Sequence, residues 1–305
     1  MSQRIVQIGL GVVGSAYALA YAHFGNSVYG IDINPERINF LSSNGIQAYH
    51  PSHIPAGLSP DIITISINTP LQENGRLCLT WLEKAMTDSV ATLIGQSRKP
   101  PVVVVRSTVP PGTTESYIAL LEQVTGKKEG MGFFMAFQPE FLRAKSAFED
   151  AMNPWRVIIG TQHDVAAETL ATLYRPMIAD HKIEVCSIQT AELHKLAHNF
   201  ANATKISYAN HIFLLAAAIG VDGSEVLKLV AQTAEAMRNP MYGMTPGTPF
   251  GGVCLPKDTS EIHGWSEEIG VPNSLPAAVL HVNEILLSMA DPADSPNWVS
   301  SAELR

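Results

Sequence analysis

A cysteine in a glycine-rich loop is the most chemically suggestive feature of this sequence. Cys254 lies in the run Phe250-Gly-Gly-Val-Cys-Leu-Pro-Lys-Asp258, which we expect just before a helix. Exposed backbone amides and the nearby cation Lys257 favour the thiolate, which is the nucleophilic form of cysteine. The competing interpretation is a buried structural thiol. It suits Cys78 and Cys186, but it suits Cys254 poorly because the Gly-Gly pair before Cys254 has no side chains to pack in a core. The loop therefore indicates covalent catalysis through Cys254.

Three polar residues share one face of a long predicted helix. Glu192, Lys195 and Asn199 are spaced i, i+3 and i+7, so they lie above one another on that helix. Burial of a lysine and an asparagine on a mostly apolar helix is costly unless they have partners. Together they can donate hydrogen bonds to one substrate oxygen. A solvated stripe with an ordinary Glu–Lys pair explains the helix pattern equally well by itself.

Two histidines on the same helix do not indicate a metal site. His194 and His198 are spaced i and i+4, which would suit two ligands. The sequence has no HExxH motif and offers no third ligand nearby. We therefore predict no metal ion and interpret these residues as surface or interface histidines.

The N-terminal segment carries a dinucleotide-binding pattern. A predicted strand runs into Gly9, Gly11 and Gly14 in GxGxxG spacing, and a helix follows. In this pattern the glycines permit a tight turn, close approach of a pyrophosphate and tight helix–strand packing. Asp32 ends the next strand at the spacing of the acid that binds the ribose, which favours NAD over NADP because Ile33-Asn-Pro35 supplies no arginine. The alternative is a glycine turn in some other α/β fold.

Composition and charge exclude several classes of protein. The chain has 305 residues, a net charge of −8, and 46% hydrophobic and 16% charged residues. These values are typical of a globular protein, and the absence of a basic run argues against a nucleic-acid partner. The sequence shows no signal peptide and no apolar stretch of membrane-spanning length, so we expect no membrane partner. Three cysteines without CxxC spacing argue against a disulfide framework, and we predict a cytoplasmic protein.

The first part of the chain alternates strands with helices, which indicates a Rossmann-type doubly wound parallel sheet of the α/β class. We assign residues 1–187 to this NAD-binding domain. The predicted strands are rich in Val, Ile and Phe, as in strands buried on both faces. They are Ile5–Ile8, Ser27–Ile31, Ile62–Ile67, Val102–Val105, Phe133–Phe137, Val157–Ile159 and Ile183–Val185. The predicted helices between them are Val12–Phe24, Trp81–Leu93 and Val165–Leu173.

The second part is predicted to be a long helix followed by an all-α dimerisation domain, residues 188–292, with a tail at 293–305. The long helix Ala191–Ile219 contains no Pro or Gly and is apolar on several faces, which indicates burial between elements or subunits. We therefore expect a homodimer through this helix. Shorter helices are predicted at Ser224–Ala236, Thr259–Glu268 and Ala277–Met289, with a loop at Asn239–Pro256 and fraying after Asp291.

Together these motifs resemble the UDP-glucose/GDP-mannose dehydrogenase family over nearly the whole chain. The resemblance rests on the glycine motif with Asp32 and on several segments further along the sequence. These are Ser107-Thr-Val-Pro-Pro-Gly112, Gln138-Pro-Glu-Phe-Leu-Arg143, Asn153-Pro-Trp-Arg-Val157, Ala191-Glu-Leu-His-Lys-Leu-Ala-His-Asn199, Gly251-Gly-Val-Cys-Leu-Pro-Lys-Asp258 and Val282-Asn-Glu284.

The resemblance implies oxidation of a primary alcohol to a carboxylate with two NAD used in succession. Cys254 then matches the thiol that captures the aldehyde as a thiohemiacetal and later forms a thioester. Glu140 matches the acid that assists hydrolysis of the thioester. Lys195, Asn199 and Asp258 match the groups that stabilise the alkoxide, the oxyanion and the water, and Thr108 matches the threonine beside that water.

The resemblance also implies two sets of binding residues. The cofactor-binding set is Gly9, Gly11, Val12, Val13, Gly14, Asp32, Asn68, Thr69, Pro70, Ser107, Thr108 and Lys257. The substrate-binding set is Phe141, Leu142, Arg143, Arg238, Phe250 and Gly251. Arg238 lies at the position of a family arginine that reaches the substrate of a neighbouring subunit.

The sequence departs from the family pattern where family members grip the substrate. The chain ends just after the middle domain, so we expect no C-terminal domain to hold the nucleotide. Phe40–Asp61 is shorter than the family's equivalent segment. Ala144 and Lys145 stand where the family has a second glutamate, and the loop around Thr245 and Pro249 lacks the usual Lys and Gly. The substrate is therefore a sugar nucleotide held differently, or a smaller sugar or nucleoside.

Two other functions compete with this interpretation. A two-electron β-hydroxyacid-type dehydrogenase also carries a Lys and an Asn one turn apart on the long helix, but it needs neither Cys254 nor Glu140. A non-catalytic NAD-binding protein would show a degenerate site, whereas the chemical residues are all present here. Both interpretations are less well supported by the sequence than the four-electron oxidation.

Overall fold

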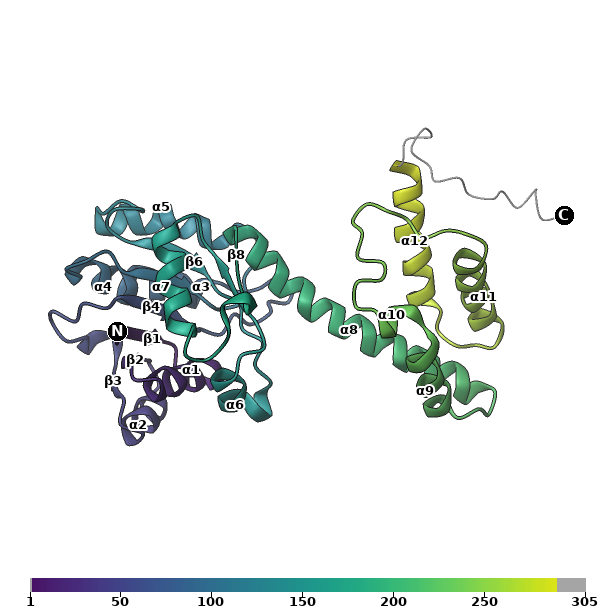
Figure 1. Cartoon of the computed structure of the whole chain (residues 1–305), viewed down its shortest axis with the longest axis horizontal. Coiled ribbons are helices and arrows are strands. Elements are labelled where there is room, and N and C mark those ends of the chain that lie inside the picture. The colour runs from purple at the N-terminus through teal and green to yellow at the C-terminus, as the bar shows by residue number, and fades with distance from the viewer. Residues whose placement is uncertain (1, 290–305) are drawn as a thin grey trace. The chain divides into compact units, whose positions relative to one another are not determined.

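The computed structural model describes residues 2–289. The chain divides into two compact units, Met1–Asn199 and Phe200–Arg305, drawn in Figure 1, and we describe each by itself. The division falls within helix α8, Ile188–Ala218. The predicted domain boundary after residue 187 lies at the beginning of α8 and stays a prediction. The predicted tail at 293–305, with the fraying after Asp291, lies outside the described residues.

The first unit contains an eight-stranded sheet in the order β3-β2-β1-β4-β5-β6-β7-β8. All neighbours from β3 to β6 pair in parallel, which confirms the predicted doubly wound sheet. The strands are β1 (Arg4–Ile8), β2 (Ser27–Ile31), β3 (Gln47–Tyr49), β4 (Ile62–Ile65), β5 (Val102–Val105), β6 (Phe134–Phe137), β7 (Val157–Gly160) and β8 (Ile183–Cys186). The short strand β3 was not predicted.

The expectation of a wholly parallel sheet is wrong at one position. β7 runs antiparallel to β6 through the pair Phe137–Gly160, and β8 is again parallel to β7. Neighbouring antiparallel strands are joined at the same edge of a sheet, so the connection from β6 to β7 does not cross a face. The segment that carries Glu140 therefore stays at the carboxyl edge of β6.

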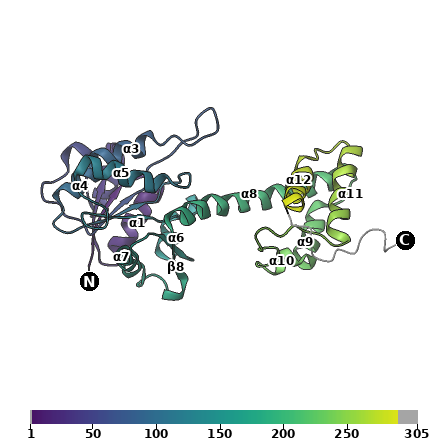
Figure 2. The same cartoon turned by 90° about the horizontal axis from the view of Figure 1, so that it is seen from above.

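Both faces of the sheet are buried, and alternate strand residues point to opposite faces. Val102 and Val104 of β5 pack with α1 (Val12–His23), α6 (Ala147–Met152) and α7 (Asp164–Tyr174). Val103 and Val105 pack on the other side with α3 (Thr80–Ala85), α4 (Ala91–Gln96), α5 (Thr113–Thr125) and the first turn of α8. Figure 2 shows α3 and α5 on one side of the sheet and α6 and α7 on the other. This double burial explains the Val- and Ile-rich strands.

The predicted helix Trp81–Leu93 is divided in the structure. It consists of α3 (Thr80–Ala85), a π-helical turn at Met86–Val90 and α4 (Ala91–Gln96). Several further elements were not predicted. They are α2 (Pro35–Ser43), α5 (Thr113–Thr125), α6 (Ala147–Met152) and the 3₁₀ turns at Pro51–His53, Ala144–Ser146 and Asp180–Lys182.

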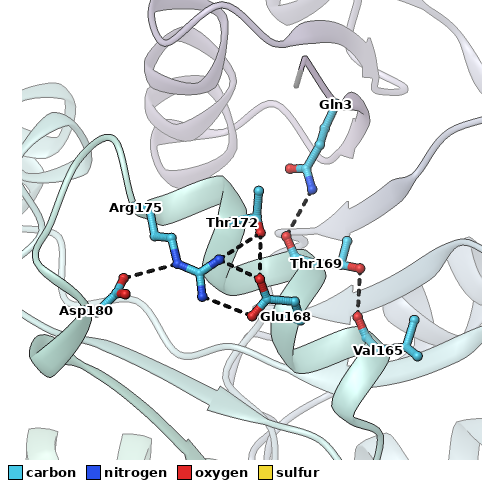
Figure 3. Close-up of polar contacts among 7 residues, drawn as sticks. All are labelled: Gln3, Val165, Glu168, Thr169, Thr172, Arg175 and Asp180. Carbon is cyan, nitrogen blue, oxygen red and sulfur yellow. Dashed lines mark hydrogen bonds and ion pairs between the residues drawn. The ribbon is translucent and has the colours of Figure 1, made fainter.

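An exposed polar network stabilises α7 and the turn after it. Arg175 forms ion pairs with Glu168 at 2.5 Å and with Asp180 at 3.1 Å (Figure 3). The amide of Gln3, just before β1, donates to the carbonyl of Thr169 at 3.0 Å. These contacts link the beginning of the chain to a helix more than 160 residues later.

The second unit consists of helices. After the second half of α8 come α9 (Gly223–Thr233), α10 (Glu235–Arg238), α11 (Cys254–Glu268) and α12 (Ser274–Met289). The predicted loop to Pro256 is wrong at its end, because α11 begins at Cys254. Pro256 is the third residue of that helix, where no intrahelical N–H bond is required. None of the helices within residues 2–289 is long and apolar enough to cross a membrane.

Candidate active site

The glycine turn after β1 has the backbone geometry that the motif predicts. Gly9 has a φ of +83°, and a Cβ there would lie 2.5 Å from the carbonyl oxygen of Ser66. A Cβ on Gly14 would lie 1.8 Å from the carbonyl oxygen of Gly9, so helix α1 packs directly on the turn. A Cβ on Gly11 would meet no protein atom within 4 Å. Gly9 and Gly14 are thus required by the fold, whereas Gly11 faces open space.

Asp32 follows β2 and accepts two backbone hydrogen bonds. Its carboxylate binds the N–H of Leu10 at 2.6 Å and the N–H of Asn34 at 2.8 Å. The acid is therefore fixed beside the glycine turn. Asn34 in turn caps α2 by accepting the N–H of Glu36, with Pro35 as the first helical residue.

A large cleft lies at the carboxyl edge of the sheet, with a volume of about 1090 Å³. It belongs wholly to the first unit. Most of the predicted cofactor-binding residues line it, namely Gly9, Gly11, Val12, Val13, Asp32, Asn68, Thr69, Pro70, Ser107 and Thr108, as does Glu140. Gly14 packs behind the turn, and Lys257 belongs to the second unit.

Several lining residues were missed by the sequence interpretation. They are Arg37 at the start of α2, His50, Pro51 and Ser52 after β3, and Trp81 and Lys84 on α3. The cap Asn34-Pro35 was a usable signal for α2 and hence for Arg37. No sequence signal brings the segment after β3 to the cleft, because β3 itself is too short to recognise. Trp81 is about half exposed (55%), which suits an aromatic wall of a ligand site.

Hydrogen bonds join the loops that follow β4 and β5. The hydroxyl of Ser107 accepts the N–H of Ile67 at 2.8 Å. The hydroxyl of Thr69 donates to the carbonyl of Thr108 at 2.8 Å. These hydrogen bonds thus fix the predicted cofactor residues of the two loops relative to each other at the wall of the cleft.

The structure brings Lys195 and Glu140 together. Lys195 is buried, and its Nζ lies 2.8 Å from Oε1 of Glu140 and 2.5 Å from the carbonyl oxygen of Glu140. The second carboxylate oxygen of Glu140 accepts the N–H of Leu142 at 2.8 Å. A buried lysine paired with a carboxylate that lines the cleft is more than a solvated stripe on a helix. Asn199, one turn further along α8, is exposed.

Glu192 is the residue that anchors this part of α8. Its side chain is fully buried and accepts the N–H of Gly112 at 2.5 Å and the N–H of Thr114 at 2.8 Å. These groups are at the N-terminus of α5, where the N-cap residue Gly112 has no side chain that could accept a hydrogen bond. Glu192 thus caps α5 from a different helix and attaches α8 to the loop that carries Thr108.

Phe141 packs against the two histidines of α8. Its ring centroid lies 5.5 Å from that of His194 and 4.7 Å from that of His198, and Nζ of Lys195 lies 5.6 Å from it. Burial, and then the charges of His198 and Lys195, lower the pKa of His194 below its ordinary value. Within residues 2–289 no three His, Cys, Asp or Glu side chains are grouped to hold a metal ion.

Arg143 is exposed and already paired within the protein. It contacts Asp150 with its backbone N–H at 2.8 Å and its guanidinium at 2.7 Å. Hydrogen bonds from Arg143 hold the pKa of Asp150 well below its usual range. The pair orders the loop after Glu140 and leaves part of the guanidinium facing solvent.

In the second unit, Cys254 is exposed at the first position of α11. This position is at the positive end of the helix dipole, which stabilises negative charge. Lys257 and Asp258 lie in the same turn and form an exposed ion pair of 3.2 Å. All three predicted residues therefore share one helix N-terminus, rather than the loop that the sequence suggested for Cys254.

The loop before Cys254 is fixed by an asparagine from α12. Asn283 is buried, accepts the N–H of Phe250 at 2.7 Å and donates to its carbonyl at 3.0 Å. Gly252, two residues before Cys254, has a φ of +73°. Arg238, at the end of α10, is exposed. Approach of these second-unit residues to the Lys195–Glu140 pair stays a prediction.

Comparison with known families agrees with this geometry. Residues 53–178 match the NAD binding domain of the UDP-glucose/GDP-mannose dehydrogenase family. Residues 189–285 match the central domain of the same family. The two matches include the part of the cleft wall that follows residue 53, nearly all of α8 and the Cys254 loop, whereas the glycine turn and Asp32 precede them.

Individual relatives show the same relationship. The GDP-mannose 6-dehydrogenase of Pseudomonas putida is 32% identical over 301 aligned residues, which cover 92% of this chain and 68% of that protein. The crystal structure of a GDP-mannose dehydrogenase from Pseudomonas aeruginosa superposes with a TM-score of 0.85 at 28% identity, covering 94% of this chain and 69% of that one. A UDP-glucose dehydrogenase from Pyrobaculum islandicum gives a TM-score of 0.70 at 32% identity, with coverages of 93% and 68%.

Proposed function

The chain belongs to the UDP-glucose/GDP-mannose dehydrogenase family of NAD-dependent oxidoreductases, and from this premise we propose that it oxidises a sugar nucleotide at a primary alcohol to the carboxylate. The overall reaction consumes one alcohol, two NAD⁺ and one water and yields one carboxylate, two NADH and three protons. The observation that carries this proposal is the Lys195–Glu140 pair at the cofactor cleft. A simple NAD-binding protein would have no need of that pair.

The cleft fits NAD at both of its ends. Gly11 leaves open space where a pyrophosphate can approach the N-terminus of α1, and Asp32 is fixed as an acceptor for ribose hydroxyls. Asp32 follows β2 and Glu140 follows β6, four strand spacings away, or roughly 19 Å at about 4.8 Å per spacing. A dinucleotide bound in extended form across the strand ends would therefore reach the pair.

The first oxidation relies on Lys195. Bound NAD supplies a hydride acceptor in each of the two oxidations. Nζ of Lys195, held by Glu140, donates a hydrogen bond to the substrate oxygen and stabilises the alkoxide as its proton leaves. Asn199, one helical turn away, provides a second donor. The product of this step is an aldehyde.

The second oxidation relies on Cys254. Its thiolate adds to the aldehyde carbon, forming a C–S bond and a thiohemiacetal that cannot diffuse away. Loss of a second hydride from the thiohemiacetal carbon, together with release of the hydroxyl proton, leaves a thioester. Water then attacks the carbonyl carbon, the C–S bond breaks, and the thiolate of Cys254 is restored. Glu140 accepts a proton of this water, while Thr108 and Asp258 orient it.

Sugar nucleotides are the first substrates to test. The relatives that align with most of this chain are named as dehydrogenases of GDP-mannose or UDP-glucose. We would supply each at a limiting concentration with excess NAD, alongside mannose 1-phosphate and guanosine, and measure NADH and acid. Acid formed from a sugar nucleotide supports the proposal. One NADH per alcohol would indicate a two-electron dehydrogenase, and no turnover on any compound would indicate a non-catalytic NAD-binding protein.

We also propose that the protein is a homodimer that pairs through α8. Large apolar side chains of α8 are exposed within the chain, including Phe200 (75%), Ile206 (63%) and Phe213 (56%). Exposed apolar patches of this kind mark interaction surfaces. A dimer by light scattering that becomes a monomer in Ile206→Glu supports this assignment, and a monomeric wild type refutes it. Arg238 would then serve the partner's site.

A cytoplasmic location is part of the same proposal. The three cysteines, Cys78, Cys186 and Cys254, are all free thiols. Free thiols and a thiol-dependent reaction suit a reducing compartment. Fractionation of the native host, with the protein detected by antibody, tests the location directly.

A further inference from the structure

A buried arginine, Arg106, occupies an unusual environment at the end of β5. It is 2% exposed. Its Nη2 donates to the hydroxyl of Tyr21 at 2.7 Å, to that of Tyr174 at 3.1 Å and to Oε1 of Gln138 at 2.6 Å. Its guanidinium carbon lies 3.7 Å from the ring centroid of Tyr17. All of these partners are neutral.

This arrangement is costly for stability alone. Burial of a charge without a carboxylate partner carries a large desolvation cost, and apolar side chains of similar size often replace buried ions without loss. Nε and Nη1 of Arg106 and Nε2 of Gln138 are buried without a partner. Arg106 is at the wall of the cleft, but its Nε and Nη1 have almost no accessible surface and its Nη2 donates to protein groups. The cation therefore acts through the protein groups that it contacts.

Gln138 provides the connection to the catalytic pair. Its backbone N–H donates to the carbonyl of Val105 at 2.9 Å, and its side-chain carbonyl accepts from Arg106 and from the hydroxyl of Tyr174. Pro139 follows, with its φ fixed by the ring, and Glu140 comes next. The direction in which Glu140 leaves β6 is therefore set by how firmly Gln138 is held.

Arg106 and Glu140 also line the same cleft. Burial is the main cause of a raised pKa at Tyr17, which Arg106 opposes and Glu140 increases. The far side of Glu140 is fixed separately, by Lys195 and by the N–H of Leu142.

We propose that Arg106 is a positioning residue that acts through Gln138 to aim Glu140 at the water that hydrolyses the thioester. This inference rests on the proposed four-electron function. Oxidation to the thioester uses Glu140 only to hold Lys195, which the backbone carbonyl of Glu140 also contacts, and not as a base. Loss of Arg106 therefore slows the step in which the C–S bond breaks and leaves the two hydride transfers less affected.

The test is a rapid-quench experiment at saturating NAD with the wild type, Arg106→Met, Gln138→Met and the double variant. Intact mass spectrometry measures the fraction of enzyme that carries the acyl group, and NADH is counted in parallel. Arg106→Met and Gln138→Met should both release about two NADH per enzyme in a burst and then accumulate acyl-enzyme. Hydrolysis should be about 10- to 100-fold slower, as expected for a misplaced catalytic group. The double variant should be no slower than either single variant.

Tyr21→Phe is the matched control, because it removes one hydroxyl from the same buried network and leaves Arg106 and Gln138 in place. It should hydrolyse the thioester at nearly the wild-type rate. Arg106→Lys, which keeps the charge, should be closer to wild type than Arg106→Met. If Arg106→Met does not fold, Gln138→Met carries the test alone.

Two results overturn the inference in different ways. An active wild type with Arg106→Met or Gln138→Met hydrolysing as fast as Tyr21→Phe refutes the role of Arg106 alone. A wild type that makes no acid from any sugar nucleotide refutes the proposed function, and the inference falls with it.

Discussion

Replacement of Glu192 by glutamine should strongly destabilise the first unit. The buried carboxylate accepts two backbone N–H groups at the N-terminus of α5. Hydrogen bonds to a charged group contribute about 1.5–3 kcal/mol each, and a neutral one contributes about 1 kcal/mol. Glutamine keeps one neutral acceptor and turns an amide N–H toward the other donor, so we expect a loss of about 2–5 kcal/mol. This is a large part of the roughly 5–15 kcal/mol of a typical domain.

The assay is unfolding of the first unit in urea, monitored by circular dichroism. With an m-value of about 3 kcal/mol/M, a loss of 3 kcal/mol lowers the midpoint by about 1 M. Glu115→Gln is the matched control, because Glu115 lies in the first turn of the same helix but accepts hydrogen bonds from the side-chain amides of Gln162 and Gln189 rather than from the helix N-terminus. Equal midpoints for Glu192→Gln and Glu115→Gln would refute the capping role.

Three further predictions follow from single contacts. Gly14→Ala should not give folded protein, because its Cβ would lie 1.8 Å from the carbonyl oxygen of Gly9. Gly11→Ala should keep the wild-type Tm, but its affinity for NAD, measured by calorimetry, should fall at least about tenfold. Asn283→Ala removes two hydrogen bonds to Phe250, so Cys254 should react faster with a thiol reagent while kcat falls; an unchanged rate of modification would contradict this. Arg175→Gln should lower Tm slightly at pH 7, and the difference from wild type should shrink as the pH falls below 4.5, because Arg175 lowers the pKa of Glu168 and that stabilisation is lost when Glu168 is protonated. A pH-independent difference would exclude the ion pair as the cause.

Much of the fold follows from local sequence patterns. The Val- and Ile-rich strands and the glycine turn are recognisable because each pattern depends on near neighbours. β3 and α6 escaped prediction because such short elements are stabilised by tertiary contacts. The direction of β7 depends on which edge its connection occupies, which no local pattern encodes. The start of α11 at Cys254 was hidden because Pro256 was interpreted as a loop residue, although proline is common in the first turn of a helix.

Site residues that belong to local sequence motifs could be predicted, but the contacts that these residues make with distant segments could not. Residue spacing indicated that Glu192 and Lys195 share a face, but not that one caps α5 while the other pairs with Glu140. These contacts join segments that are 50 to 80 residues apart, and helix periodicity carries no information about them. For the same reason no role could be assigned to Arg106 or Trp81 from the sequence, and Asn283 was noted only as part of a motif.

The most direct test of the four-electron mechanism is the ratio of NADH to substrate under limiting sugar nucleotide. We would compare the wild type with Cys254→Ala and with Cys78→Ala, which removes a thiol that no step uses. We expect two NADH and one carboxylic acid per substrate for the wild type and Cys78→Ala, and no acid for Cys254→Ala. One NADH per substrate, unchanged by the loss of Cys254, would contradict it.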